Sequence, residues 1–87
     1  MFAILCYDVE TERNAKVKKI VRQYFRPIQK SVCEGFITEG KLKKLYAQLK
    51  PVLDPAKDSV VVYKFASTLS FEKMCIGQSN GNEDLII

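Results

Sequence analysis

The sequence predicts a single α+β domain, and three observations support this prediction. The chain has 87 residues, a length typical of one domain. Short apolar runs alternate with two amphipathic stretches of helical period. Their order is strand, helix, one or two strands, helix, strand. This order indicates the ferredoxin-like βαββαβ fold, in which both helices cover one face of the sheet, with an extra C-terminal strand or hairpin.

The first strand is predicted at the start of the chain. Residues 1–7 are apolar, which favours a strand buried on both faces, because a half-exposed strand would alternate with polar residues. The run ends at Asp8, and a carboxylate at the end of a central strand can reach solvent. Asp8 therefore marks the predicted functional edge of the domain.

A basic amphipathic helix is predicted to follow. Thr11 is a candidate cap. Pro27 is expected to end the helix, because the residue before a proline avoids helical backbone angles. The apolar stripe consists of Val17, Ile20, Val21, Tyr24 and Phe25. The cationic face consists of Arg13, Lys16, Lys18, Lys19 and Arg22.

The middle of the chain predicts a strand region and a second helix. Residues 28–38 fit a short edge strand and a longer central one, with Ser31 near the change. Gly35 indicates a bulge or the close approach of another backbone. Thr38 opens the second helix, and Pro51 stops or kinks it. The apolar stripe of this helix is Leu42, Leu45, Tyr46 and Leu49.

The C-terminal third is predicted to complete the sheet. Residues 59–65 contain a second strand that is apolar on both faces, and residues 71–76 fit a strand or a short helix. Residues 79–82 are typical of a turn, and residues 84–87 of a final short strand. Within the single domain 1–87, we assign residues 1–66 to the core. We assign residues 67–87 to a segment for dimerisation or partner binding.

A second copy of the chain is the expected cover for the sheet face that the helices leave open. Burying a large aliphatic side chain contributes roughly 1.5–3 kcal/mol, and a soluble monomer rarely exposes a large apolar patch. A two-fold homodimer would cover this face and bring each edge residue toward its symmetry mate.

The composition restricts the possible chemistry. The chain has no histidine, and its cysteines, Cys6, Cys33 and Cys75, lack C-x-x-C spacing. A zinc site and Ser-His or Cys-His catalysis are therefore not expected. The net charge of +4 favours an anionic polymer as partner. No apolar run approaches the roughly 20 residues of a membrane span, and no signal peptide is evident, so we expect a cytoplasmic protein without membrane contact.

Two candidate sites follow from the residues alone. Mg²⁺ is often held by one or two carboxylates together with a phosphate, and two Asp8 side chains across a dimer axis would provide such a site. The ion would activate water or polarise a phosphodiester. The alternative is that Asp8 only starts a turn. The cationic face of the first helix is a candidate track for phosphates, or else an ordinary solvated helix surface.

Several stretches together resemble the small adaptation protein family of CRISPR systems. They are Tyr7-Asp8-Val9 with the basic helix after it, the stretches 28–35 and 58–63, and the tail from Ile76-Gly77 onward. The resemblance implies a ferredoxin-like homodimer with C-terminal strands exchanged or packed across it. It implies Mg²⁺ or Mn²⁺ held by two Asp8 side chains, with Tyr7 and Ser31 in support and Arg26 among the nucleic-acid-binding cations.

The resemblance also implies a function in spacer acquisition. A protein of this family is expected to be a metal-dependent phosphodiester endonuclease on RNA or double-stranded DNA, and the central scaffold between dimers of the CRISPR integrase. Two alternatives remain open at this point. One is a non-catalytic DNA-binding scaffold that bridges the integrase dimers, and the other is a ferredoxin-like toxin ribonuclease that needs no integrase.

Overall fold

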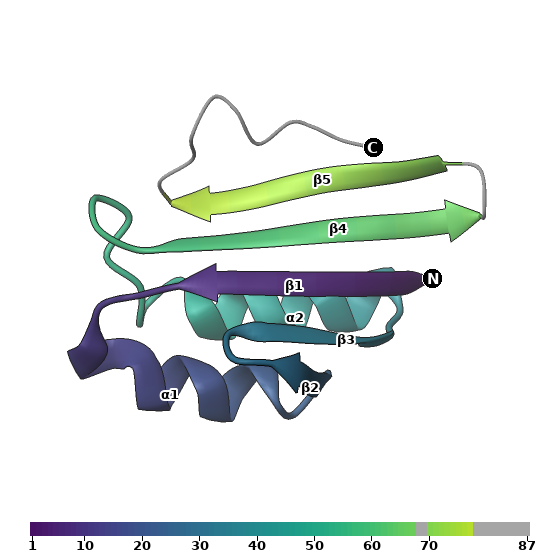
Figure 1. The fold of residues 1–87 in the computed structure, drawn as a ribbon. Coiled ribbons are helices and arrows are strands. Elements are labelled where there is room, and N and C mark those ends of the chain that lie inside the picture. Colours follow the sequence, from purple (N-terminus) through teal and green to yellow (C-terminus); the bar gives the residue numbers. More distant parts are fainter. Residues whose placement is uncertain (68–69, 78–87) are drawn as a thin grey trace.

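The computed structural model describes residues 1–67 and 70–77, and it confirms the predicted α+β fold (Figure 1). In this part of the chain, two helices accompany an antiparallel five-stranded sheet of order β2-β3-β1-β4-β5. This is the ferredoxin-like arrangement with β5 added beside β4. The elements are β1 (Phe2–Asp8), α1 (Thr11–Val21), β2 (Arg26–Gln29), β3 (Val32–Phe36), α2 (Glu39–Leu49), β4 (Ser59–Ser67) and β5 (Ser70–Gly77).

The sheet buries the face that packs on the helices and leaves the other face partly open. Along β1, the buried residues Ala3, Leu5 and Tyr7 alternate with partly exposed ones. The expected burial of β1 on both faces is therefore not met within one chain, because only the side under the helices is covered. The helices and β4 fill this core with Val17, Val21, Leu42, Leu45, Leu49, Val60 and Val62.

Helix α1 ends earlier than predicted. It closes at Val21 with Arg22 as its C-cap, and the N–H groups of Tyr24 and Phe25 both donate to the carbonyl of Val21. The reason lies in β2, which contains Pro27 and pairs with β3 from residue 26 onward, so the chain must be extended before the proline. Phe25 nevertheless reaches the core, which explains why it continues the helical stripe.

The two helices begin in different ways. Thr38 is the N-cap of α2, as predicted, and its hydroxyl oxygen accepts a hydrogen bond from the Lys41 amide at 3.2 Å. In α1 the N-cap is Glu10 rather than Thr11, and no side chain caps the helix. Neither helix in the described ranges has the length and apolar character of a membrane-spanning segment.

The end of the described chain forms a strand rather than a helix. β5 pairs with β4 in the same chain, from Ser59 opposite Gly77 to Ser67 opposite Ser70. Gly77 has a φ of 95°, and a Cβ there would lie 2.1 Å from the carbonyl oxygen of Asp58. The close contact of these strands therefore requires glycine. The predicted turn at 79–82 and strand at 84–87 lie outside the described residues.

Candidate functional site

Asp8 is exposed at the end of the central strand. It pairs with Ser59 of β4, and its place in the β1 alternation puts its side chain on the sheet face opposite the helices. Within the described chain its carboxylate forms no hydrogen bond or ion pair. The side chain is therefore available to a ligand.

One chain does not complete a metal site at this position. The described residues contain no group of three or more Cys, Asp or Glu side chains placed to hold an ion. A single carboxylate offers at most two oxygens, whereas Mg²⁺ requires a near-octahedral set of oxygen ligands. The exposed Asp8 oxygens are of the type that Mg²⁺ and Mn²⁺ prefer. The residues thus fit one half of a site that a second copy would complete.

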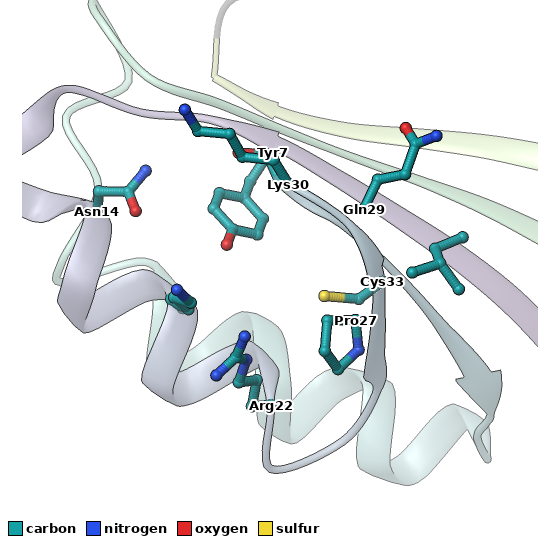
Figure 2. Close-up of a pocket in the computed structure, with 10 residues that line it drawn as sticks. Tyr7, Asn14, Arg22, Pro27, Gln29, Lys30 and Cys33 are labelled. Atoms are coloured by element: carbon teal, nitrogen blue, oxygen red, sulfur yellow. The ribbon is translucent and has the colours of Figure 1, made fainter.

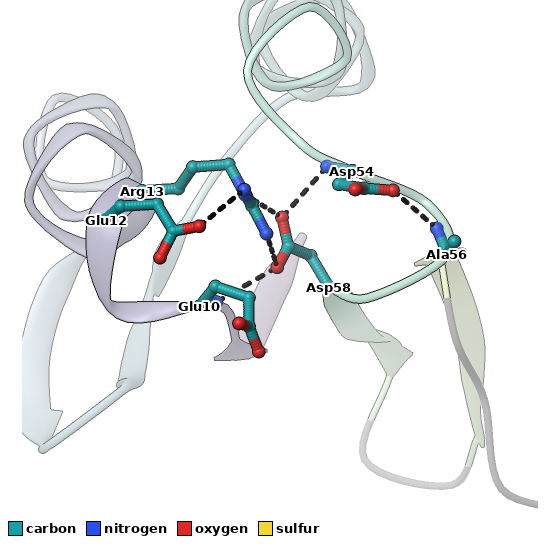
Figure 3. A network of polar contacts seen from close by, with 6 residues as sticks. All are labelled: Glu10, Glu12, Arg13, Asp54, Ala56 and Asp58. Atoms are coloured by element: carbon teal, nitrogen blue, oxygen red, sulfur yellow. Dashed lines mark hydrogen bonds and ion pairs between the residues drawn. The ribbon is translucent and has the colours of Figure 1, made fainter.

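A buried ion pair holds the chain next to Asp8 (Figure 3). The Asp58 carboxylate is fully buried and accepts two hydrogen bonds from the guanidinium of Arg13, from Nε and, at 2.9 Å, from Nη2. It also accepts from the backbone amides of Glu10 at 3.0 Å and Asp54 at 2.9 Å. The bond from Arg13 holds the pKa of Asp58 well below its usual range, and the pKa of Arg13 is raised in return. We call these four residues the Asp58 clasp.

The clasp fixes the backbone that follows Asp8 and the start of the neighbouring strand β4, with which Asp8 pairs. Glu10 follows Asp8 by two residues, and Ser59, which pairs with Asp8, directly follows Asp58. Arg13 was predicted to bind nucleic acid, but here its side chain is directed to Asp58 and is only 20% exposed. Its contribution to nucleic-acid binding stays a prediction, and it has a structural role that the pattern of the helix did not indicate.

The other five predicted cations are all exposed, and three of them do not line the cavity described below. Lys16 and Lys19 are exposed on α1. Arg26 is exposed on β2, where its guanidinium donates to the Glu34 carboxylate at 3.0 Å. Because Glu34 balances part of the Arg26 charge, Lys16 and Lys19 are the more available pair for phosphates.

The remaining predicted residues meet around one cavity between α1 and the β2–β3 turn (Figure 2). Lys18 lines it from α1, Arg22 from the C-cap of this helix, and the buried Tyr7 from β1. Ser31, in the turn, has a φ of 65°, and its carbonyl accepts a hydrogen bond from the Tyr7 amide at 3.0 Å. The structure therefore separates this group from Asp8, whose side chain lies on the other face of the sheet.

Asp58 is the residue of this region that sequence reasoning missed. It ends the stretch 54–58, which is typical of an exposed turn, and its partner Arg13 lies 45 residues away. The one sequence signal for the role of Asp58 is its position directly before an apolar strand. A single sequence does not show which cation such a carboxylate meets.

Comparison with known proteins identifies the family. The family model described as CRISPR associated protein Cas2 matches residues 1–74. CRISPR-associated endoribonuclease Cas2 3 of Thermodesulfovibrio yellowstonii is 43% identical over 76 residues, covering 87% of this chain and 86% of the relative. CRISPR-associated endoribonuclease Cas2 of Thermotoga maritima is 36% identical over 86 residues, covering 99% of each chain.

A solved structure supports the same assignment. The crystal structure of Streptococcus pyogenes Cas2 superposes with a TM-score of 0.69 at 27% identity, covering 78% of this chain and 89% of that chain. The resemblance to CRISPR adaptation proteins and the ferredoxin-like fold are thereby confirmed. The chain belongs to the Cas2 family of CRISPR-associated proteins.

Proposed function

We propose that this protein is a homodimeric, nucleic-acid-binding endonuclease of CRISPR spacer acquisition, with its catalytic site formed by Asp8 of both subunits. The observation that carries the proposal is the exposed Asp8 carboxylate at the end of the central strand. The Asp58 clasp holds the backbone that follows Asp8 and the start of β4 beside it. The family supports the reaction class, because relatives are named endoribonucleases. Such enzymes hydrolyse phosphodiester bonds.

The outer sheet face supports the dimer. Phe2, Ile4 and Cys6 share this face with Asp8 and are only partly buried. On β3, Phe36 is 81% exposed, and its ring packs edge-on against Phe2 with centroids 5.1 Å apart. An apolar face of this kind is stabilised when a second copy covers it. A two-fold axis close to the end of β1 would bring the two Asp8 carboxylates together.

Ile4→Lys is expected to prevent dimerisation, because it places a charge in the middle of the outer face without entering the helix-facing core. Sedimentation velocity should show a dimer for the unmodified protein and a folded monomer for this variant. Ala47→Lys adds the same charge on the exposed surface of α2 and is expected to leave the dimer intact. A dimeric Ile4→Lys variant, or an unmodified protein that is monomeric, would contradict this arrangement.

The chemistry of the proposed site divides between the carboxylates and the cations. A divalent ion, when bound there, would polarise a phosphoryl oxygen and lower the pKa of a coordinated water. The role of Asp8 is to hold that ion with oxygens whose backbone is fixed. The cations of α1 bind the phosphates of the substrate and set its register, because phosphate contacts position a nucleic acid without reading its sequence.

Reversing the charge of Lys16 and Lys19 is expected to weaken duplex binding and to flatten its salt dependence. Each lost phosphate contact reduces the log–log slope by about 0.9 on double-stranded DNA. Fluorescence anisotropy with a labelled duplex over a series of salt concentrations measures this slope. Lys43→Glu with Lys44→Glu on α2 makes the same change in net charge away from α1. Equal losses in both double variants would show a general charge effect and contradict a specific α1 surface.

A non-catalytic scaffold is the second candidate function. The observation that favours it is the exposed pair Lys16 and Lys19 on α1, which can hold a duplex backbone without any metal ion. In this role the protein would bridge dimers of the CRISPR integrase through the duplex that it binds. Membership of the Cas2 family favours both of these functions over a toxin ribonuclease.

A further inference from the structure

The cavity between α1 and the β2–β3 turn combines Lys18 and Arg22 with neutral side chains that binding of a duplex backbone does not require (Figure 2). Its volume is about 400 Å³, at the lower end of the range for small-molecule sites. This volume suits a single ligand of nucleotide size and excludes a double helix. It lies on the helix side of the sheet, so a partner on the outer face would leave it open.

The cavity is lined by three cations and by no acidic residue among those described. Lys18 lies in the last turn of α1, Arg22 is the C-cap of this helix four residues later, and Lys30 lies in the β2–β3 turn. In Figure 2, the guanidinium of Arg22 points from the helix into the space, and the side chain of Lys30 extends along the opposite side. Like charges at this spacing repel one another. A bound anion would remove this repulsion.

The turn that carries Lys30 is held in a fixed conformation. Ser31 has a left-handed φ of 65°, which costs a non-glycine residue free energy. The hydrogen bond from the Tyr7 amide to the Ser31 carbonyl, at 3.0 Å, ties the turn to the central strand. Lys30 is therefore placed beside the cavity by backbone structure that exists before any ligand arrives.

The inner wall of the cavity is neutral and suits a base. Burial raises the pKa of Tyr7 and of Cys33, so both side chains are uncharged at neutral pH. Figure 2 shows the Tyr7 hydroxyl and the Cys33 sulfur directed into the space, with Pro27 beside the sulfur. The Asn14 amide on α1 also lines the space, and it can both donate and accept hydrogen bonds at a base edge.

We propose that this cavity binds one nucleoside phosphate, with the phosphate between Arg22 and Lys30 and the base along the neutral inner wall toward Asn14. Phosphate oxygens only accept hydrogen bonds, which matches lysine and arginine, since these only donate. The same ligand has two sources, a free nucleotide or an unpaired nucleotide of a bound strand. A bound strand as the source rests on the proposed function that α1 binds nucleic acid, because Lys18 and Arg22 neighbour Lys16 and Lys19 on and at the end of this helix.

Calorimetric titration with AMP, adenosine and inorganic phosphate tests the ligand class, and two DNA hairpins test its source. One hairpin has a blunt end and the other a single-nucleotide overhang. The test variant is Arg22→Gln with Lys30→Gln, and the control is Lys43→Gln with Lys44→Gln, which removes the same charge from α2. Asn14→Ala tests the base wall alone. Thermal unfolding of each variant verifies that it is folded.

The expected result is saturable AMP binding that is tighter than binding of adenosine or phosphate. It should weaken by about tenfold or more in Arg22→Gln/Lys30→Gln, which removes charge-assisted hydrogen bonds, and remain unchanged in the α2 control. Asn14→Ala should weaken the binding of AMP but not of phosphate. A preference for the overhang that the test variant abolishes assigns the nucleotide to a strand, and AMP binding without such a preference assigns it to a free nucleotide.

Other outcomes overturn the proposal. Phosphate binding as tight as AMP binding, with no effect of Asn14→Ala, would leave only an anion site. Equal losses in the test and control variants would leave only a general charge effect. If the blunt hairpin binds, AMP does not bind and the overhang does not tighten hairpin binding, the cavity inference fails and the proposed function stands. If AMP binds and the blunt hairpin does not, the duplex-binding function fails instead.

Discussion

Asp58→Asn is expected to lower the free energy of unfolding by about 3 kcal/mol, the lower end of the cost of breaking a buried ion pair. The carboxylate is fully buried and accepts from Arg13 and from two backbone amides. Asparagine keeps the shape but has one acceptor oxygen and no charge. The cost is expected at the lower end of this range because the Arg13 side chain is 20% exposed, so its charge can be partly hydrated once Asp58 is replaced. Chemical denaturation measures the loss, which is a large fraction of the stability of a small domain.

The same substitution is expected to change the pH dependence of stability. In the folded protein the pKa of Asp58 lies below its usual value, mainly because of the hydrogen bond from Arg13. The stabilisation is therefore present above the unfolded-state pKa of about 4 and is lost as the pH falls toward the folded-state value. The unmodified protein should lose stability over this acidic range. The slope should be smaller in Asp58→Asn, because the titrating group is absent.

Asp54→Asn is the matched control for this experiment. It makes the same chemical change four residues earlier, where the side chain accepts a hydrogen bond from the exposed Ala56 amide, and its cost should be well below that of Asp58→Asn. Arg13→Gln should also destabilise the fold, and the double variant should cost less than the sum of the single changes. Additive costs, or an unchanged acid slope in Asp58→Asn, would contradict the clasp.

Local patterns in the sequence were sufficient to predict most of the fold. The apolar run of β1, the Thr38 cap and the stripe through Leu42 to Leu49 each depend on neighbours within a few residues, and each is found in the structure. The end of α1 was missed because a long-range constraint decides it. The pairing of β2 with β3 forces the chain out of the helix before Pro27, and no local signal marks that point.

The candidate site was predictable only in part, for a similar reason. Asp8 and the exposed lysines of α1 follow from strand and helix periodicity. The ion pair of Arg13 and Asp58 joins helix α1 to the loop before β4, and only the folded sheet brings these two segments together. Lys30 gains its place beside Arg22 through the left-handed turn at Ser31, and serine gives little indication of that backbone conformation. Whether two Asp8 side chains meet depends on a second copy.

Asp8→Asn is expected to abolish phosphodiester cleavage, with a loss of at least about a hundredfold. Mutating a residue that only hydrogen-bonds to a metal ligand already lowers metal affinity or activity by about 10–100-fold. Asparagine retains the size of the side chain but offers one neutral oxygen in place of an anionic pair. The exposed carboxylate has no partner within the described residues, so stability and duplex binding should be unchanged. Cleavage of labelled RNA and duplex DNA with Mg²⁺, with Mn²⁺ and with chelator measures the effect.

Glu10→Gln provides the matched control, since its exposed side chain also carries a carboxylate, two residues beyond Asp8, while only its backbone amide joins the clasp. It should cleave as the unmodified protein does. Full activity of Asp8→Asn under strict metal control would exclude the two-carboxylate mechanism. If the unmodified protein does not cleave, and Asp8→Asn supports spacer integration while reversal of Lys16 and Lys19 stops it, the protein acts as the scaffold. The Asp8 pair would then have no catalytic role, and the function would reside in the α1 cations.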